Sequence, residues 1–116
     1  MKRRNFTDER LNQLLNSLSK SKSKFWTAVG KRLTTPRNNR AAVNLNKLDR
    51  FAGKELTLVV PGKVLSVGNL SVKTSIAALS FSQGAAKKIA DSGGKIMTLE
   101  ELFEDNPKGL KAKMVI

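Results

Sequence analysis

The sequence predicts an α/β fold, a small sheet packed by helices, preceded by a basic N-terminal helical arm. Apolar residues recur at helical spacing up to residue 33, whereas short β-branched runs alternate with capped helical segments after residue 41. The chain has 116 residues, which is the size of one domain. We therefore expect a basic helical arm and contact loop over residues 1–41 and a small α/β globular domain over residues 42–116.

Two helices are predicted in the arm. The first should begin near residue 8, because Thr7 is a suitable N-cap and acidic residues follow it. Serine and lysine alternate over residues 19–24, which indicates a hinge, and Pro36 ends the second helix at or before Thr35. The apolar stripes of the two helices comprise Leu11, Leu14, Leu15, Leu18, Trp26, Val29 and Leu33.

Trp26 has two possible roles, stacking on an unpaired base or packing in the core. Its phase with Val29 and Leu33 is more typical of a core or interface residue. The two helices are expected to bury little apolar surface unless they are docked, which predicts that residues 1–22 are largely disordered in the free protein.

The second half is predicted to alternate strands and helices, with both faces of the sheet covered. Ser82 and Thr98 are N-caps, the latter in a capping box with Glu101, and Asn44 is a third candidate cap. The expected segments are an extended piece at 41–43, a helix ending near 52, a strand at 56–60 closed by a Pro61–Gly62 turn, an extended stretch at 70–81, a helix to about 92, a strand at 96–97, a helix from about 99 and a strand at 110–116.

The composition excludes several classes of enzyme. There is no His and no Cys, hence no imidazole base, thiol nucleophile, zinc site with nitrogen or sulfur ligands, or disulfide. Neither a Walker motif nor a G-x-G-x-x-G motif occurs. Helix capping explains the acidic residues near the C-terminus better than a metal site does. We expect no enzymatic activity, cofactor, metal or small-molecule substrate.

Membrane association is also not expected. Lys2, Arg3 and Arg4 are followed by Phe6 and then by polar residues rather than by the apolar run of an export signal. The apolar runs elsewhere are far shorter than the ~20 residues needed to span a bilayer. The sequence therefore predicts a soluble, intracellular protein with no membrane partner.

The charge distribution points to a polyanionic partner. The formal net charge is +13, from 22 Lys or Arg and 9 Asp or Glu. Residues 1–54 contain 14 basic and 3 acidic residues, a net charge of +11, and all seven arginines. Arginine suits bidentate phosphate contacts. A basic surface can simply be solvated, but a half-chain with this charge favours contact with nucleic acid.

The segment Thr34–Arg40, T-T-P-R-N-N-R, is the most informative short segment for binding. It is either an ordinary connector or an RNA-contact loop, and its density of Arg and Asn favours the second interpretation. Together with the basic residues of the arm it gives the predicted RNA-binding set. That set is Lys2, Arg3, Arg4, Arg10, Lys20, Lys22, Lys24, Lys31, Arg32, Arg37, Asn38, Asn39, Arg40 and Lys63.

Residues 24–116 resemble a known family. The shared features are K-F-W-T-A-V-G-K-R-L-x-x-P-R from Lys24, A-x-V-N-L, V-V-P-G-K-V-L from Val59, A-A-L-x-F-S from Ala77, G-G-K and the closing N-P-K-G. The chain is similar to archaeal large-subunit ribosomal protein eighteen-e, whose family is related to bacterial ribosomal protein fifteen.

The resemblance implies a structural protein of the large ribosomal subunit in the cytoplasm. Its partners would be the large-subunit ribosomal RNA and neighbouring large-subunit ribosomal proteins. The main alternative is a free-standing RNA chaperone or regulator that binds many RNAs transiently. A ribosomal protein stays stoichiometric with the large subunit through a moderate salt wash, whereas a chaperone is removed.

Overall fold

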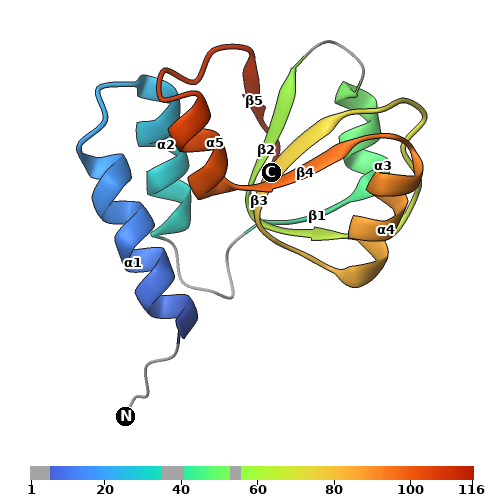
Figure 1. Ribbon diagram of the computed structural model, residues 1–116, viewed down its shortest axis with the longest axis horizontal. Helices are drawn as coiled ribbons and strands as arrows, with labels where there is room; N and C mark the ends of the chain where they lie inside the picture. Colours follow the sequence, from blue (N-terminus) through green and yellow to red (C-terminus); the bar gives the residue numbers. More distant parts are fainter. Residues whose placement is uncertain (1–5, 35–40, 53–55) are drawn as a thin grey trace.

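The computed structural model describes residues 6–34, 41–52 and 56–116, and shows the predicted α/β architecture (Figure 1). A five-stranded parallel sheet is packed by helices. The helices are α1 (Phe6–Ser19), α2 (Lys24–Leu33), α3 (Leu45–Leu48) with a 3-10 turn (Asp49–Phe51), α4 (Gln83–Asp91) and α5 (Leu99–Asp105). The strands are β1 (Ala41–Asn44), β2 (Thr57–Leu65), β3 (Ser75–Phe81), β4 (Lys95–Thr98) and β5 (Ala112–Met114).

Strand β2 is the centre of the sheet. The strand order is β1-β2-β3-β4, and β5 also pairs with β2. Residues 57–59 of β2 pair with β5, whereas residues 62–65 pair with β1. The long strand thus joins the first and last strands of the sheet, and it holds the C-terminal segment beside the N-terminal half of the chain.

The turn predicted at Pro61–Gly62 is wrong, because β2 runs through both residues. A register shift against β3 between Val60 and Lys63 accommodates the proline, which has no N–H to donate to the ladder. Gly62 is required by close approach of β1. A Cβ atom at this position would lie 2.0 Å from the carbonyl oxygen of Ala41.

The extended stretch predicted from Leu70 is shorter than expected, since β3 begins at Ser75. The preceding loop is anchored to the 3-10 turn instead. The Ser71 N–H and hydroxyl donate to the two carboxylate oxygens of Asp49, at 2.8 and 2.9 Å. Asn44 precedes α3 but makes no side-chain cap bond, and its Oδ1 accepts from the Val67 N–H at 3.1 Å.

Most of the predicted caps and ends of the other helices are confirmed. Ser82 caps α4, and Thr98 forms the predicted capping box with Glu101 at the start of α5. Helix α2 ends at Leu33, before Pro36 as predicted. Helix α1 starts at Phe6, so Thr7 lies inside the helix rather than at its N-cap.

Two apolar clusters cover the two faces of the sheet, as predicted. One cluster joins Leu45 of α3 and Ile89 of α4 to sheet residues such as Leu58. The other joins α1, α2 and α5 to Val59 and Ala77 on the opposite face. The expectation that the arm helices bury little apolar surface is wrong. Their buried residues are Leu11, Leu14, Leu18, Trp26, Val29 and Leu33.

No helix in the described ranges is long and apolar enough to cross a membrane.

Candidate nucleic-acid interface

The turn between α1 and α2 has a defined conformation. The Ser21 hydroxyl accepts from the Ser23 N–H at 3.0 Å, and Ser23 in turn caps α2 by accepting from the Trp26 N–H. Lys22 and Lys24 flank Ser23 and are exposed. In this alternating segment, the serines therefore fix the turn, whereas the lysines remain in solvent.

Trp26 anchors this end of the molecule. Its ring is fully buried, and its Nε1–H donates to the Asn106 carbonyl at 2.8 Å. Phe25 and Phe103 pack edge-on against it, with ring centroids 5.3 and 5.1 Å away. The core interpretation of Trp26 is confirmed, and the ring is not presented for base stacking.

The loop between α5 and β5 packs on the same end. The Asn106 side chain closes the loop by donating to the Leu110 carbonyl at 2.7 Å and accepting from its N–H at 3.1 Å. Gly109 has φ +71° and lies so close to α2 that an added Cβ would be 2.8 Å from Phe25 Cβ. Both its backbone conformation and its packing favour glycine.

This loop brings a further lysine to the α1–α2 turn. The Ser23 hydroxyl donates to the Lys108 carbonyl at 3.0 Å, although the two residues are 85 positions apart. Lys108 is exposed, and Figure 1 shows the α5–β5 loop beside the start of α2. We call this surface the basic corner. It comprises Lys20, Lys22, Lys24 and Lys108.

The basic corner is not neutralised internally. Among the described residues, the ammonium groups of Lys22, Lys24 and Lys108 have no hydrogen-bond or ion-pair partner. Sequence reasoning missed Lys108, because it lies in the nearly neutral second half of the chain. The N-P-K-G motif marked a turn there, but only the fold places that turn beside Ser23.

Arg10 has a different environment. Its guanidinium binds Glu100 of α5 in a bidentate arrangement, with Nε–Oε2 at 2.6 Å and Nη2–Oε1 at 3.0 Å. The hydrogen bonds from Arg10 lower the pKa of Glu100, and the same pair raises the pKa of Arg10. The pair ties α1 to α5, so this charge is engaged within the protein.

The remaining predicted residues are distributed more widely. Lys31 and Arg32 are exposed in the last turn of α2, where cations interact favourably with the helix dipole. Lys63 is exposed on β2, between Ala42 of β1 and Ser80 of β3, and does not belong to the basic corner. Seven residues lie outside the described ranges: Lys2, Arg3, Arg4, Arg37, Asn38, Asn39 and Arg40.

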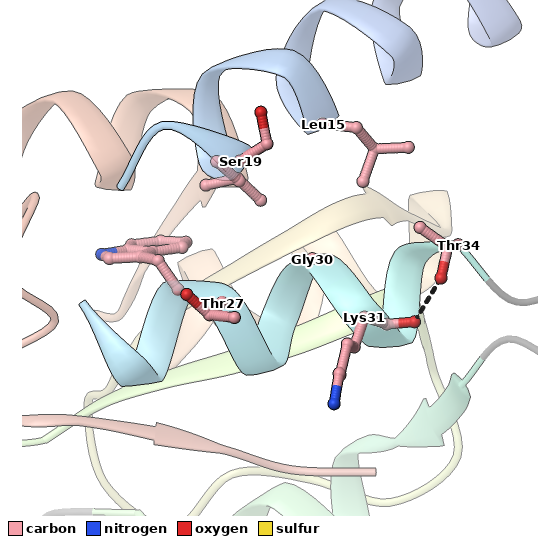
Figure 2. Close-up of a pocket in the computed structure, with 8 residues that line it drawn as sticks. Leu15, Ser19, Thr27, Gly30, Lys31 and Thr34 are labelled. Atoms are coloured by element: carbon pink, nitrogen blue, oxygen red, sulfur yellow. Dashed lines mark hydrogen bonds between the residues drawn. The ribbon is translucent and has the colours of Figure 1, made fainter. Parts of the chain in front are cut away.

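A groove lies between α1 and α2, with a volume of about 350 Å³ (Figure 2). Half-buried Leu15 contributes apolar surface to it, and the buried side chains of Leu18 and Trp26 also line it. Thr27 and Thr34 lie along its α2 side, and Lys31 extends from that helix away from α1 (Figure 2). Within the described ranges, no group of three or more acidic residues is placed to hold a metal ion.

Comparisons with known proteins identify a family for the chain. The model of the family "Ribosomal protein 60S L18 and 50S L18e" matches residues 2–115. The chain is 46% identical over 107 residues to large ribosomal subunit protein eL18 of Methanoregula boonei, covering 89% of this chain and 88% of the relative. It is 41% identical to the protein of that name from Archaeoglobus fulgidus over 103 residues, covering 89% and 88% of the two chains.

The corresponding protein of Methanothermobacter thermautotrophicus is 41% identical over 113 residues, which cover 94% of this chain and 93% of the relative. The family match thus includes the arm helices, the sheet and the loop that carries Lys108. The chain belongs to the ribosomal protein family of 60S L18 and 50S L18e.

Proposed function

We propose that this protein is a structural component of the large ribosomal subunit in the cytoplasm. It binds large-subunit ribosomal RNA through the basic corner and through the basic residues before and after α1 and α2. Membership of the family supports the ribosomal role, since the relatives are named as large-subunit proteins. The observation that carries the RNA contact is the group of exposed, unneutralised lysines around Ser23 and Lys108.

The mechanism is electrostatic and positional. Lysines that contact phosphates release condensed counterions, so affinity falls steeply as salt concentration rises. The turn that carries these lysines is fixed by Ser23 and by the Trp26 anchor, so the backbone positions from which the lysines extend keep a defined spacing. Phosphate contacts orient a protein on RNA but carry little sequence information. Specificity therefore depends on RNA shape and on the rigid placement of the lysines.

Different roles for residues 1–41 and residues 42–116 are part of this proposal. The first segment contributes most of the RNA contacts, among them those of Arg37 and Arg40. The second segment provides the sheet on which α1 and α2 are packed, and it contacts neighbouring ribosomal proteins. The packing of α1 and α2 on the sheet supports a preformed rather than a disordered RNA-binding surface.

The test is co-sedimentation with archaeal large ribosomal subunits from which the endogenous homologue has been removed. The wild-type protein should remain stoichiometric through a moderate salt wash. Arg37→Ala with Arg40→Ala should weaken retention and flatten its salt dependence. A protein that washes off completely would instead be a transient RNA-binding protein, and an unchanged salt dependence in the double variant would remove the 35–40 segment from the interface.

A further inference from the structure

Gly30 occupies an unusual position in the middle of α2. Glycine destabilises a helix interior relative to alanine, so its presence there needs a reason. Its φ is not in the left-handed region. An added Cβ would lie 3.8 Å from the nearest atoms of Leu18, which is ordinary van der Waals contact. Neither backbone conformation nor packing within the protein requires glycine at this position.

Gly30 does line the groove between α1 and α2 (Figure 2). The absence of a side chain allows a ligand to approach the α2 backbone closely. The groove volume of about 350 Å³ is within the roughly 300–1,000 Å³ range of sites for small organic groups. A glycine that the protein's own packing does not require is explained if something outside the protein occupies this space.

The polar groups around the groove restrict what can enter it. The Thr27 hydroxyl donates to the Ser23 carbonyl at 2.9 Å, and the Thr34 hydroxyl donates to the Lys31 carbonyl at 2.7 Å. Their protons are committed, so both oxygens are available only as acceptors. The occupant should therefore have an apolar body and hydrogen-bond donors at its edge.

The charge of the lining adds a second constraint. None of the eight lining residues, all in the described part of the chain, is acidic, and Lys31 extends away from α1. The lining therefore does not repel a phosphate next to the groove, but it does not bind one inside it. One unstacked nucleotide meets these conditions: its base is the apolar body, ribose hydroxyl or base amino groups are the donors, and its phosphates stay outside the groove.

We infer that the groove between α1 and α2 binds a single splayed-out nucleotide of the RNA, and that Gly30 keeps the groove open for it. This inference rests on the proposed function, because it names a second kind of contact to the same RNA. The basic corner binds phosphates, whereas the groove accommodates one nucleoside.

The test combines Gly30→Ala and Gly30→Leu with large-subunit ribosomal RNA from Methanoregula boonei as the probe. Gly30→Ala should raise Tm by about 4 °C through helix propensity and yet weaken RNA binding roughly threefold. Gly30→Leu should weaken binding roughly tenfold or more. Neither variant should alter the salt slope, since no charge is removed. Ala90→Leu, an exposed position on α4, is the matched control and should bind as the wild type does.

The outcomes separate the two proposals. Unchanged RNA affinity in both Gly30 variants would overturn the nucleotide groove while leaving the proposed function intact. If the variants lose binding only to RNA that already carries other ribosomal proteins, the occupant is a protein and the inference is wrong. If the wild-type protein does not bind the RNA, the proposed function itself fails.

Discussion

The two faces of the sheet use their lysines in opposite ways. On the face covered by α3 and α4, Lys88 donates to the carbonyls of Ser66 and Gly68, at 2.8 and 2.9 Å, and Lys87 lies 3.7 Å from Asp91. On the face covered by α1, α2 and α5, the lysines of the basic corner have no such partners among the described residues. Lys88 joins α4 to the loop before β3, whereas the lysines of the basic corner are available to a partner.

The comparison also shows what the arm helices contribute. Their apolar residues complete the core on one face of the sheet, while their lysines are exposed to solvent. An α1–α2 pair that were only an RNA-binding extension would not bury Trp26 completely. The same helices therefore contribute to stability and carry the lysines of the proposed RNA contact, and mutations can separate these two roles.

The largest effect is expected for Trp26→Ala, which should destabilise the protein by about 3–5 kcal/mol, because it leaves a cavity and removes the hydrogen bond to Asn106. Ile89→Ala on the other face is the matched variant and should cost about 2–5 kcal/mol. Urea unfolding measures both. If Trp26→Ala costs less than about 1 kcal/mol, the arm does not belong to the core.

Gly109→Ala should cost about 1–3 kcal/mol, because the new Cβ would meet Phe25 and the residue would keep a positive φ. The variant should also displace Lys108 from the α1–α2 turn. NMR chemical shifts of Ser23 and Lys108 report that movement. Gly84→Ala in the first turn of α4 provides a control in which these shifts stay unchanged, and displaced shifts in both variants would show a general rather than a local effect.

Glu100→Gln should have the smallest effect on stability, about 0.5–1 kcal/mol, because the bidentate pair with Arg10 is partly exposed. The folded state lowers the pKa of Glu100, so the contribution is complete above the ordinary Glu pKa of about 4.3 and is lost as the pH falls through the folded-state pKa. Urea unfolding at pH 7 and at pH 3 should show the difference shrinking in acid. A difference that persists at low pH would exclude the ion pair as its cause.

Local signals predicted much of the fold. The caps at Ser82 and Thr98 were predictable because an N-cap depends on residues within one turn. The turn at Pro61–Gly62 was predicted wrongly because the close approach of β1 requires that glycine, and β1 is distant in sequence. The turn propensity of Pro and Gly is a property of these residue types alone, whereas their conformation in the fold depends on the strand that pairs with them.

The same limit applies to the site. The lysines of the α1–α2 turn were predictable from the serine–lysine alternation. Lys108 was not, because its position depends on the contacts of Ser23 and Trp26 with a loop at least 80 residues away. The ion pair between Arg10 and Glu100 was not predictable either, because a count of charged residues does not show which cations are paired within the fold.

The salt dependence of RNA binding tests the central claim most directly. Lys22→Ala, Lys24→Ala and Lys108→Ala would be combined and compared with Lys73→Ala combined with Lys87→Ala, using the same large-subunit ribosomal RNA. We expect the log–log salt slope of the basic-corner variant to fall by roughly 0.7–0.9 for each phosphate that the variant no longer neutralises, and that of the comparison variant to match the wild type. Equal slopes in the two variants would show that the basic corner does not bind the RNA backbone.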